Sequence, residues 1–110
     1  MPLFITYASY STSGLQGLLA KPEDRGAAIQ ALMDKVGARV VALYFTTGTN
    51  DVVMVSEAAD GTDTVALGMA VAASGAVQDV ETVRAWTSAE FGDIARKAAS
   101  LTASYSPPGG

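Results

Sequence analysis

The sequence predicts an α+β domain built on a four-stranded antiparallel sheet, and three observations carry this prediction. β-branched and aromatic residues gather in four short runs, two helical segments separate these runs, and a third helical segment follows the last run. The order strand, helix, strand, strand, helix, strand is the split βαβ pattern, whose right-handed crossovers place both intervening helices on one sheet face. We therefore expect a ferredoxin-like βαββαβ sandwich with an extra C-terminal helix.

The four strand segments are apolar on both of their alternating faces. This pattern is typical of strands that are covered on both sides. Between the second and third segments, positions 46–51 contain Gly, Asn and Asp, which favour a turn and therefore a hairpin. The expected strands are Leu3–Ala8, Arg39–Phe45, Val52–Ser56 and Val77–Trp86.

Helical spacing of apolar residues predicts three helices. The first spans Pro22–Val36, with a proline and two acids in its first turn, and the second spans Thr64–Ala73 behind turn and capping residues. The third has a capping box, in which Thr87 is the N-cap and Glu90 reaches back to it. Its expected buried stripe consists of Phe91, Ile94, Ala95, Ala98 and Leu101.

The remaining segments are irregular. Ser9–Leu19 lacks a sustained period, so we expect a loop there, with a short helical turn at positions 14–19. Positions 105–110 carry two prolines and two glycines and are typical of a flexible C-terminal tail. A chain of 110 residues forms one core, so we expect a single domain over positions 1–104.

Composition excludes several classes of function. The formal charge of −4, with no basic run, disfavours nucleic acid and anionic membrane surfaces as partners. The chain has neither cysteine nor histidine, which removes thiol chemistry, the Ser-His-Asp triad and the usual haem and metal ligands, so we expect no metal and no cofactor. The first residues show no secretion-signal pattern and Val65–Ala73 is too short to cross a bilayer, which favours a cytoplasmic protein.

Both helices between the strands lie on one face of the expected sheet, so the opposite apolar face lacks a cover. Large uncovered apolar surfaces mark interfaces or ligand grooves. We therefore expect a homo-oligomer, at least a dimer, formed through the helix-free face, with a cleft at the interface.

Four segments together resemble the GYD domain family in their order and spacing. They are Phe4–Ser11, Pro22–Arg25, Tyr44–Gly48 with Asp51, and Thr82–Thr87. The resemblance implies a dimeric α/β barrel in which two such sheets face each other, and it implies no particular reaction. At the motif that names the family, the glycine and the acid are present, but Asn50 stands where the tyrosine is expected.

Two neighbouring strand positions are the first candidates for a binding site. Arg84 and Trp86 alternate with apolar residues, and we expect both to point with Thr82 away from the helices. A guanidinium beside an indole could hold a carboxylate or an enolate. The same two residue types also dominate subunit contacts, so an interface anchor is the equal alternative.

Three further residues are weaker candidates. Asp51 could act as a general base or polar anchor, although a turn residue that holds the backbone is the simpler reading. Tyr7 and Tyr44 could line the same cleft and donate to a ligand oxygen, or they could be half-buried core tyrosines.

No motif identifies catalytic residues, and three functions stay open. The first is a small-molecule binding or accessory protein for an apolar ligand that carries a carboxylate or ketone. The second is a cofactor-free oxygenase or isomerase that acts on an aromatic or lactone-type substrate. The third is a purely structural oligomer.

Overall fold

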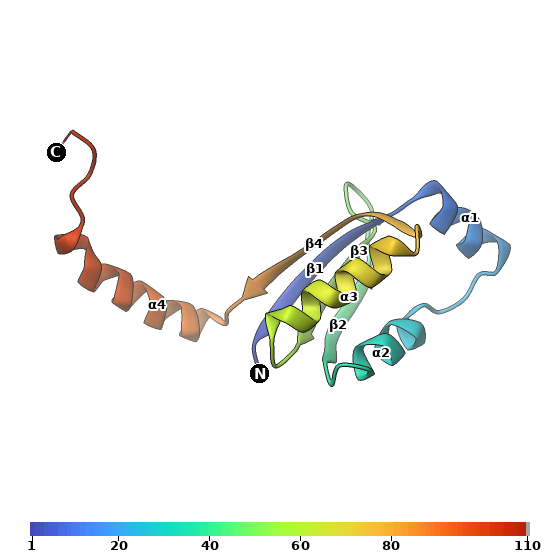
Figure 1. Cartoon of the computed structure of the whole chain (residues 1–110), viewed down its shortest axis with the longest axis horizontal. Coiled ribbons are helices and arrows are strands. Elements are labelled where there is room, and N and C mark those ends of the chain that lie inside the picture. Colours follow the sequence, from blue (N-terminus) through green and yellow to red (C-terminus); the bar gives the residue numbers. More distant parts are fainter. Residues whose placement is uncertain (110) are drawn as a thin grey trace.

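The computed structural model describes residues 1–109. Figure 1 shows a sheet with two helices packed against one of its faces, a third helix beyond one end of the strands, and a fourth helix beyond the other end. The elements are β1 (Leu3–Tyr10), α1 (Thr12–Ala20), α2 (Gly26–Asp34), β2 (Arg39–Phe45), β3 (Val52–Glu57), α3 (Gly61–Ala73), β4 (Val77–Ala85), α4 (Ser88–Leu101) and a 3-10 turn, η1 (Thr102–Ser104).

The four strands form one antiparallel sheet in the order β2-β3-β1-β4, as the split βαβ pattern predicts. The first strand along the chain therefore lies inside the sheet, between β3 and β4. The register places Phe4 opposite both Ser56 and Arg84, which fixes the residues that share a face across three strands. The ferredoxin-like fold is thus confirmed for the described residues.

Helices α2 and α3 cover the face of the sheet to which Phe4 belongs. The buried cluster beneath them consists of Phe4, Met33, Ala38 and Ala58. α3 packs mainly on β4 and α2 on β2, so the two helices lie over opposite edges of the sheet (Figure 1). This separation leaves the middle of the covered face without a helix directly above it.

Three helices differ from the prediction at their starts. α3 begins at Gly61 instead of Thr64, because the Asp60 carboxylate caps it. Ser9–Leu19 is not a loop: β1 continues to Tyr10, and α1 begins where the Ser11 hydroxyl accepts a hydrogen bond from the Gly14 N–H at 3.0 Å. The next helix begins at Gly26 instead of Pro22, because the Asp24 carboxylate accepts the Gly26 N–H at 2.8 Å and holds the preceding residues in a turn.

The C-terminal helix α4 was predicted correctly as a helix and wrongly as a core element. Both hydrogen bonds of its capping box are present, between Thr87 and Glu90. No residue of α4 is buried, and its only substantial contact is with η1. The radius of gyration is therefore 17.9 Å, whereas a compact chain of this length has about 13 Å.

Residues 105–109 contain neither helix nor strand, and Gly110, the last residue of the predicted tail, lies outside the described residues. Among the described residues, no helix combines the length and the hydropathy needed to cross a membrane.

Candidate functional site

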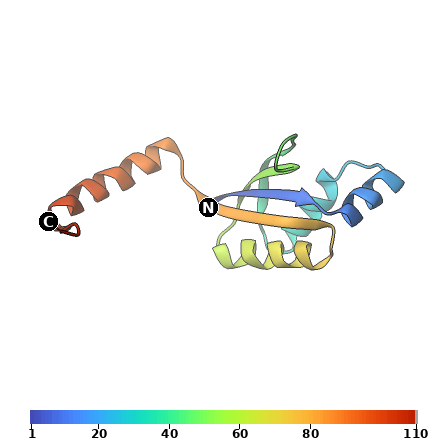
Figure 2. The same cartoon turned by 90° about the horizontal axis from the view of Figure 1, so that it is seen from above.

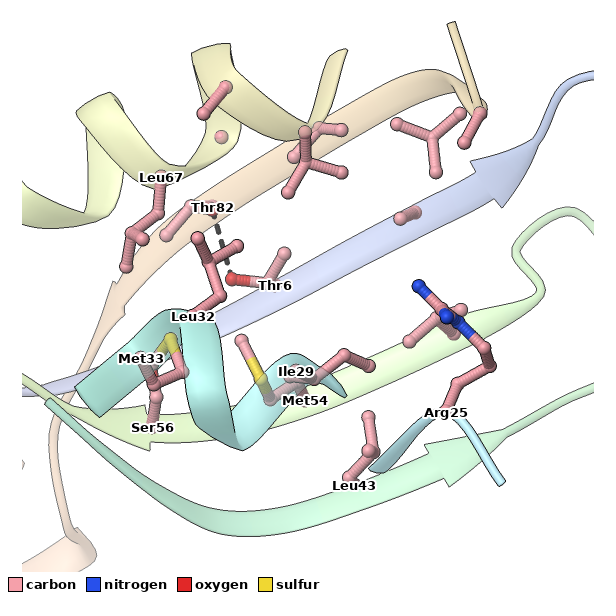
Figure 3. A pocket seen from close by; sticks show the side chains of 18 of the residues that line it. Thr6, Arg25, Ile29, Leu32, Met33, Leu43, Met54, Ser56, Leu67 and Thr82 are labelled. Carbon is pink, nitrogen blue, oxygen red and sulfur yellow. Dashed lines mark hydrogen bonds between the residues drawn. The ribbon is translucent and has the colours of Figure 1, made fainter. Parts of the chain in front are cut away.

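A cavity of about 360 Å³ opens between the sheet and the two covering helices (Figure 3). It lies over the middle of the covered face, where α2 and α3 diverge. β1, β3 and β4 form its floor, and apolar side chains of the two helices form its walls. The aliphatic and methionine side chains that line it are Ile29, Leu32, Met33, Leu43, Val52, Met54, Leu67, Val71, Val77 and Val80.

A pair of threonines places polar atoms on this apolar floor. The Thr6 and Thr82 hydroxyls lie opposite each other on β1 and β4, with 2.9 Å between their oxygens (Figure 3). One hydroxyl donates to the other, so the second retains its own proton. That proton can be donated to an acceptor in the cavity, such as a carbonyl or carboxylate oxygen.

Two other hydroxyls of the lining are used within α3 and its C-terminal cap. Thr64 donates to the Gly61 carbonyl at 2.7 Å, and Ser74 donates to the Val71 carbonyl at 2.6 Å. Both bonds serve the backbone around α3. The threonine pair on the floor is therefore better placed than these two hydroxyls to orient a ligand.

One cationic side chain lines the cavity. Arg25 immediately precedes α2, and the Asp24 turn that starts this helix fixes its backbone. The guanidinium forms a hydrogen-bonded ion pair with Glu23 at 2.7 Å, and the side chain is 41% exposed. A group that is half in water binds an anion without the full cost of burying a charge. Arg25 can thus hold the polar end of a ligand.

The structure corrects the predicted orientation of Arg84. Thr82 lines the cavity, and Arg84 lies two residues further along β4, on the same side of the strand. Arg84 therefore belongs to the covered face and not to the helix-free face. Its guanidinium donates to the Leu3 carbonyl at 3.2 Å and to the Ala85 carbonyl, and it stacks 4.7 Å from the Trp86 ring centre and 5.7 Å from that of Phe4. Arg84 therefore ties the ends of β1 and β4 together.

Trp86 follows the last residue of β4 and is 46% exposed beneath this guanidinium. Neither Arg84 nor Trp86 lines the cavity. The cavity lies on the opposite face of the sheet from the interface cleft expected beside these two residues, and that cleft stays a prediction.

Asp51 holds the backbone of a neighbouring strand. Its carboxylate accepts the Tyr10 N–H at 2.8 Å, and its own N–H donates to the Ala8 carbonyl at 2.9 Å. Both contacts connect the β2–β3 hairpin to the end of β1. The observed geometry matches that of a structural turn residue.

Tyr7 and Tyr44 lie on the helix-free face, which we call the open face. Both are paired with Val53, Tyr7 from β1 and Tyr44 from β2, so the two rings flank one valine on the same surface. They share a surface as expected, but not the cavity. The apolar residues of the open face include Leu3, Ile5, Tyr7, Ala42, Tyr44, Val53, Val55, Val83 and Ala85.

The acidic residues near the helix starts are used in capping. Asp60 accepts from the N–H and hydroxyl of Thr62, at 2.9 and 3.0 Å, and these bonds lower the pKa of its carboxyl below the ordinary value. Hydrogen bonds from Thr87, chiefly from its backbone N–H, likewise lower the pKa of Glu90. Across residues 1–109, no three acidic side chains gather as a metal site would require.

The fold is that of a ferredoxin-like α+β domain, and an apolar cavity lies between its sheet and helices α2 and α3. The chain belongs to the GYD domain family, whose model matches residues 4–95. Among solved structures it is similar to the crystal structure of TTHA0845 from Thermus thermophilus, with a TM-score of 0.50 and 17% identity over 80% of this chain and 96% of that chain. At this identity the similarity shows the fold alone. Curated proteins gave no match.

Proposed function

We propose that this protein binds a small apolar molecule that carries a carboxylate or ketone, in the cavity between the sheet and helices α2 and α3. The cavity itself is the observation that carries the proposal. Its volume of about 360 Å³ falls within the range of about 300–1,000 Å³ that is typical of ligand pockets. The apolar part of the ligand would contact the aliphatic walls, and its oxygen would accept the spare proton of the Thr6 and Thr82 pair.

The energetic cost of so large a space supports an occupant. At about 24 cal/mol per Å³, a sealed and empty cavity of 360 Å³ would lower stability by up to about 9 kcal/mol. A whole domain is stable by only about 5–15 kcal/mol. The cavity is partly open to solvent, which reduces this cost, but a molecule that fills the apolar walls recovers more of it.

Binding is favoured over catalysis by the chemistry of the lining. Tyr10 and Arg25 are the two ionisable side chains among the described residues that line the cavity. A cofactor-free oxygenase or isomerase would need a group that moves a proton near neutral pH, and the described lining contains no histidine, carboxylate or thiol for this step. The enzymatic alternative therefore has less support than a binding or accessory role.

A dye titration tests the location of this site. The fluorescent probe 1-anilinonaphthalene-8-sulfonate combines aromatic rings with one anionic group, so it matches the proposed ligand class. We expect saturable binding of one probe per chain. Ala28→Trp fills part of the cavity from α2 and should weaken binding at least tenfold. Ala27→Trp is the matched control, because this neighbouring residue is exposed and does not line the cavity.

Two results would count against the proposal. Equal affinity of the two tryptophan variants would place the probe outside the cavity. Absence of saturable binding, together with an intact oligomer, would favour the purely structural alternative.

We further propose that the open face contacts a second copy of the chain, so that the protein is at least a dimer. Tyr44 is 67% exposed and Val83 38% exposed on this face, which is costly for aliphatic and aromatic groups in water. In the arrangement that the family resemblance predicts, the two sheets meet directly as a dimeric α/β barrel. Multi-angle light scattering after size exclusion measures the mass, and a strict monomer at about 50 μM would overturn this second proposal.

A further inference from the structure

We infer that α4 carries a second contact between copies of this chain, in which two α4 helices pair antiparallel through their apolar stripes. The α4 stripe consists of Phe91, Ile94, Ala95, Ala98 and Leu101. Its second half lies beyond residue 95, where the match to the family model ends. The pairing uses no residue of the open face, which stays free for the proposed sheet-to-sheet dimer.

The first observation is that α4 has an apolar side with nothing packed on it. Phe91 is 60%, Ile94 39% and Leu101 57% exposed. Spacings of three, four and seven residues place the stripe on one side of the helix. An isolated helix of 14 residues is marginal in water. A second helix on the stripe would remove these side chains from water and stabilise the helical conformation.

The second observation is the position of α4. Within the part of the chain that the structure describes, its only substantial contact is with η1. Figure 2 shows α4 beyond the end of the strands, apart from the sheet and from the other three helices, and the view in Figure 1 agrees. A helix of a second copy can therefore approach α4 along its length.

The third observation is that the stripe is complementary to itself in size. In an antiparallel pair centred between Ile94 and Ala95, each large side chain lies opposite a small one. Phe91 meets Ala98 of the second copy, and Ile94 meets Ala95 of the second copy. The same contacts repeat across the two-fold axis, because the pair is isologous. Large residues facing small ones let two helices approach closely and interdigitate.

Charge complementarity sets the antiparallel orientation. Glu90 and Lys97 are seven residues apart, so they lie in one row beside the stripe. In an antiparallel pair this row faces the same row of the second copy in reverse, which brings Glu90 near Lys97 of the second copy. The Thr87 N–H occupies one Glu90 oxygen at 2.8 Å, so the other oxygen can accept from that lysine. A parallel pair would bring like charges together, which disfavours it.

Cysteine cross-linking tests the pairing directly, because the wild-type chain contains no cysteine. Chains carrying Phe91→Cys are mixed with differently tagged chains carrying Ala98→Cys and oxidised under air. We expect a covalent heterodimer, since an antiparallel pair brings these positions within disulfide distance. Two Phe91→Cys chains should not cross-link, because seven residues separate the positions by about 10 Å along the helix.

Ser100→Cys is the matched control for Ala98→Cys. Ser100 is exposed on the far side of α4 from the stripe. In the same mixture with Phe91→Cys chains, it should give about tenfold less heterodimer, because its side chain points away from the paired helix.

Each other outcome has a definite meaning. Stronger cross-linking of Phe91→Cys chains with each other than in the mixture shows a parallel pair and overturns the inference. Absence of every cross-link also overturns it, and the sheet-to-sheet dimer then stands if the mass is still that of a dimer. A heterodimer that forms while Tyr44→Asp leaves self-association unchanged supports the α4 pair and overturns the open-face contact.

A second variant measures the contribution of the stripe to self-association. Analytical ultracentrifugation gives the concentration at which association is half complete. Ile94→Asp should raise this concentration about tenfold, whereas Ser100→Asp should leave it within about twofold. Circular dichroism should show that both variants keep the folded body, because α4 contributes no buried residue to it. An association curve that Ile94→Asp leaves unchanged would overturn the inference.

Discussion

Gly14 allows α1 to touch the turn between α3 and β4, and replacing it by alanine tests the geometry of that contact. A β-carbon at Gly14 would overlap the Ala76 carbonyl oxygen and lie 2.9 Å from its carbonyl carbon. The same carbonyl accepts the Ser11 N–H at 3.0 Å, so the backbone must shift and weaken this bond. Overpacking against backbone costs roughly 1–3 kcal/mol, and about 4–8 °C of melting temperature is lost per kcal/mol in a domain of this size.

Gly17 supplies the control within the same helix. A β-carbon there meets no atom within 4 Å, so Gly17→Ala should raise stability by roughly 0.5–1 kcal/mol through helix propensity alone. Urea denaturation followed by circular dichroism measures both variants under identical conditions. If Gly14→Ala proves as stable as Gly17→Ala, the reasoning about this close approach is refuted.

Three other predictions concern single side chains. Asp51→Ala should lower the free energy of unfolding by roughly 1–3 kcal/mol in urea denaturation, because it leaves the Tyr10 N–H without its carboxylate partner; an unchanged midpoint would contradict the structural role. Arg84→Met should lower the melting temperature while leaving dye affinity within twofold, since the guanidinium binds backbone carbonyls outside the cavity; weaker dye binding at unchanged stability would return Arg84 to the ligand site. For Glu90 the folded-state pKa is depressed, so its contribution to α4 is complete above the ordinary glutamate pKa and is lost as pH falls through the lowered value. Circular dichroism should show a loss of helix in acid, and Glu90→Gln should remove the part of this loss that comes from α4.

Local signals predicted the elements of this fold well, because their causes lie within a few residues. The Thr87 and Glu90 capping box acts over one turn, and the Gly and Asn of positions 46–51 act within one hairpin. α1 was missed for a similar local reason. Its nine residues include two glycines and no charge, so the cap formed by Ser11 is its clearest signal.

The candidate site could not be predicted in the same way. Alternation along β4 shows that Thr82 and Arg84 share a face, but it does not show which face the helices cover when both faces are apolar. The cavity depends on α2 and α3 lying over opposite edges of the sheet, and no sequence pattern encodes that spacing. A cation next to an Asx turn, as at Arg25, is the weak signal that could have indicated the polar part of the cavity lining.

The apolar stripe of α4 shows what periodicity can and cannot establish. The pattern correctly predicted a helix that places Phe91, Ile94 and Leu101 on one side. It carried no information on whether this chain buries that side. Burial in the parent domain was therefore the wrong part of the prediction.

A helix that adds nothing to the core of its own domain is free to change without penalty to folding. Substitutions along α4 would leave the buried cluster unchanged, whereas substitutions under α2 and α3 would alter stability and the shape of the cavity. Selection can then act on α4 and on the core separately.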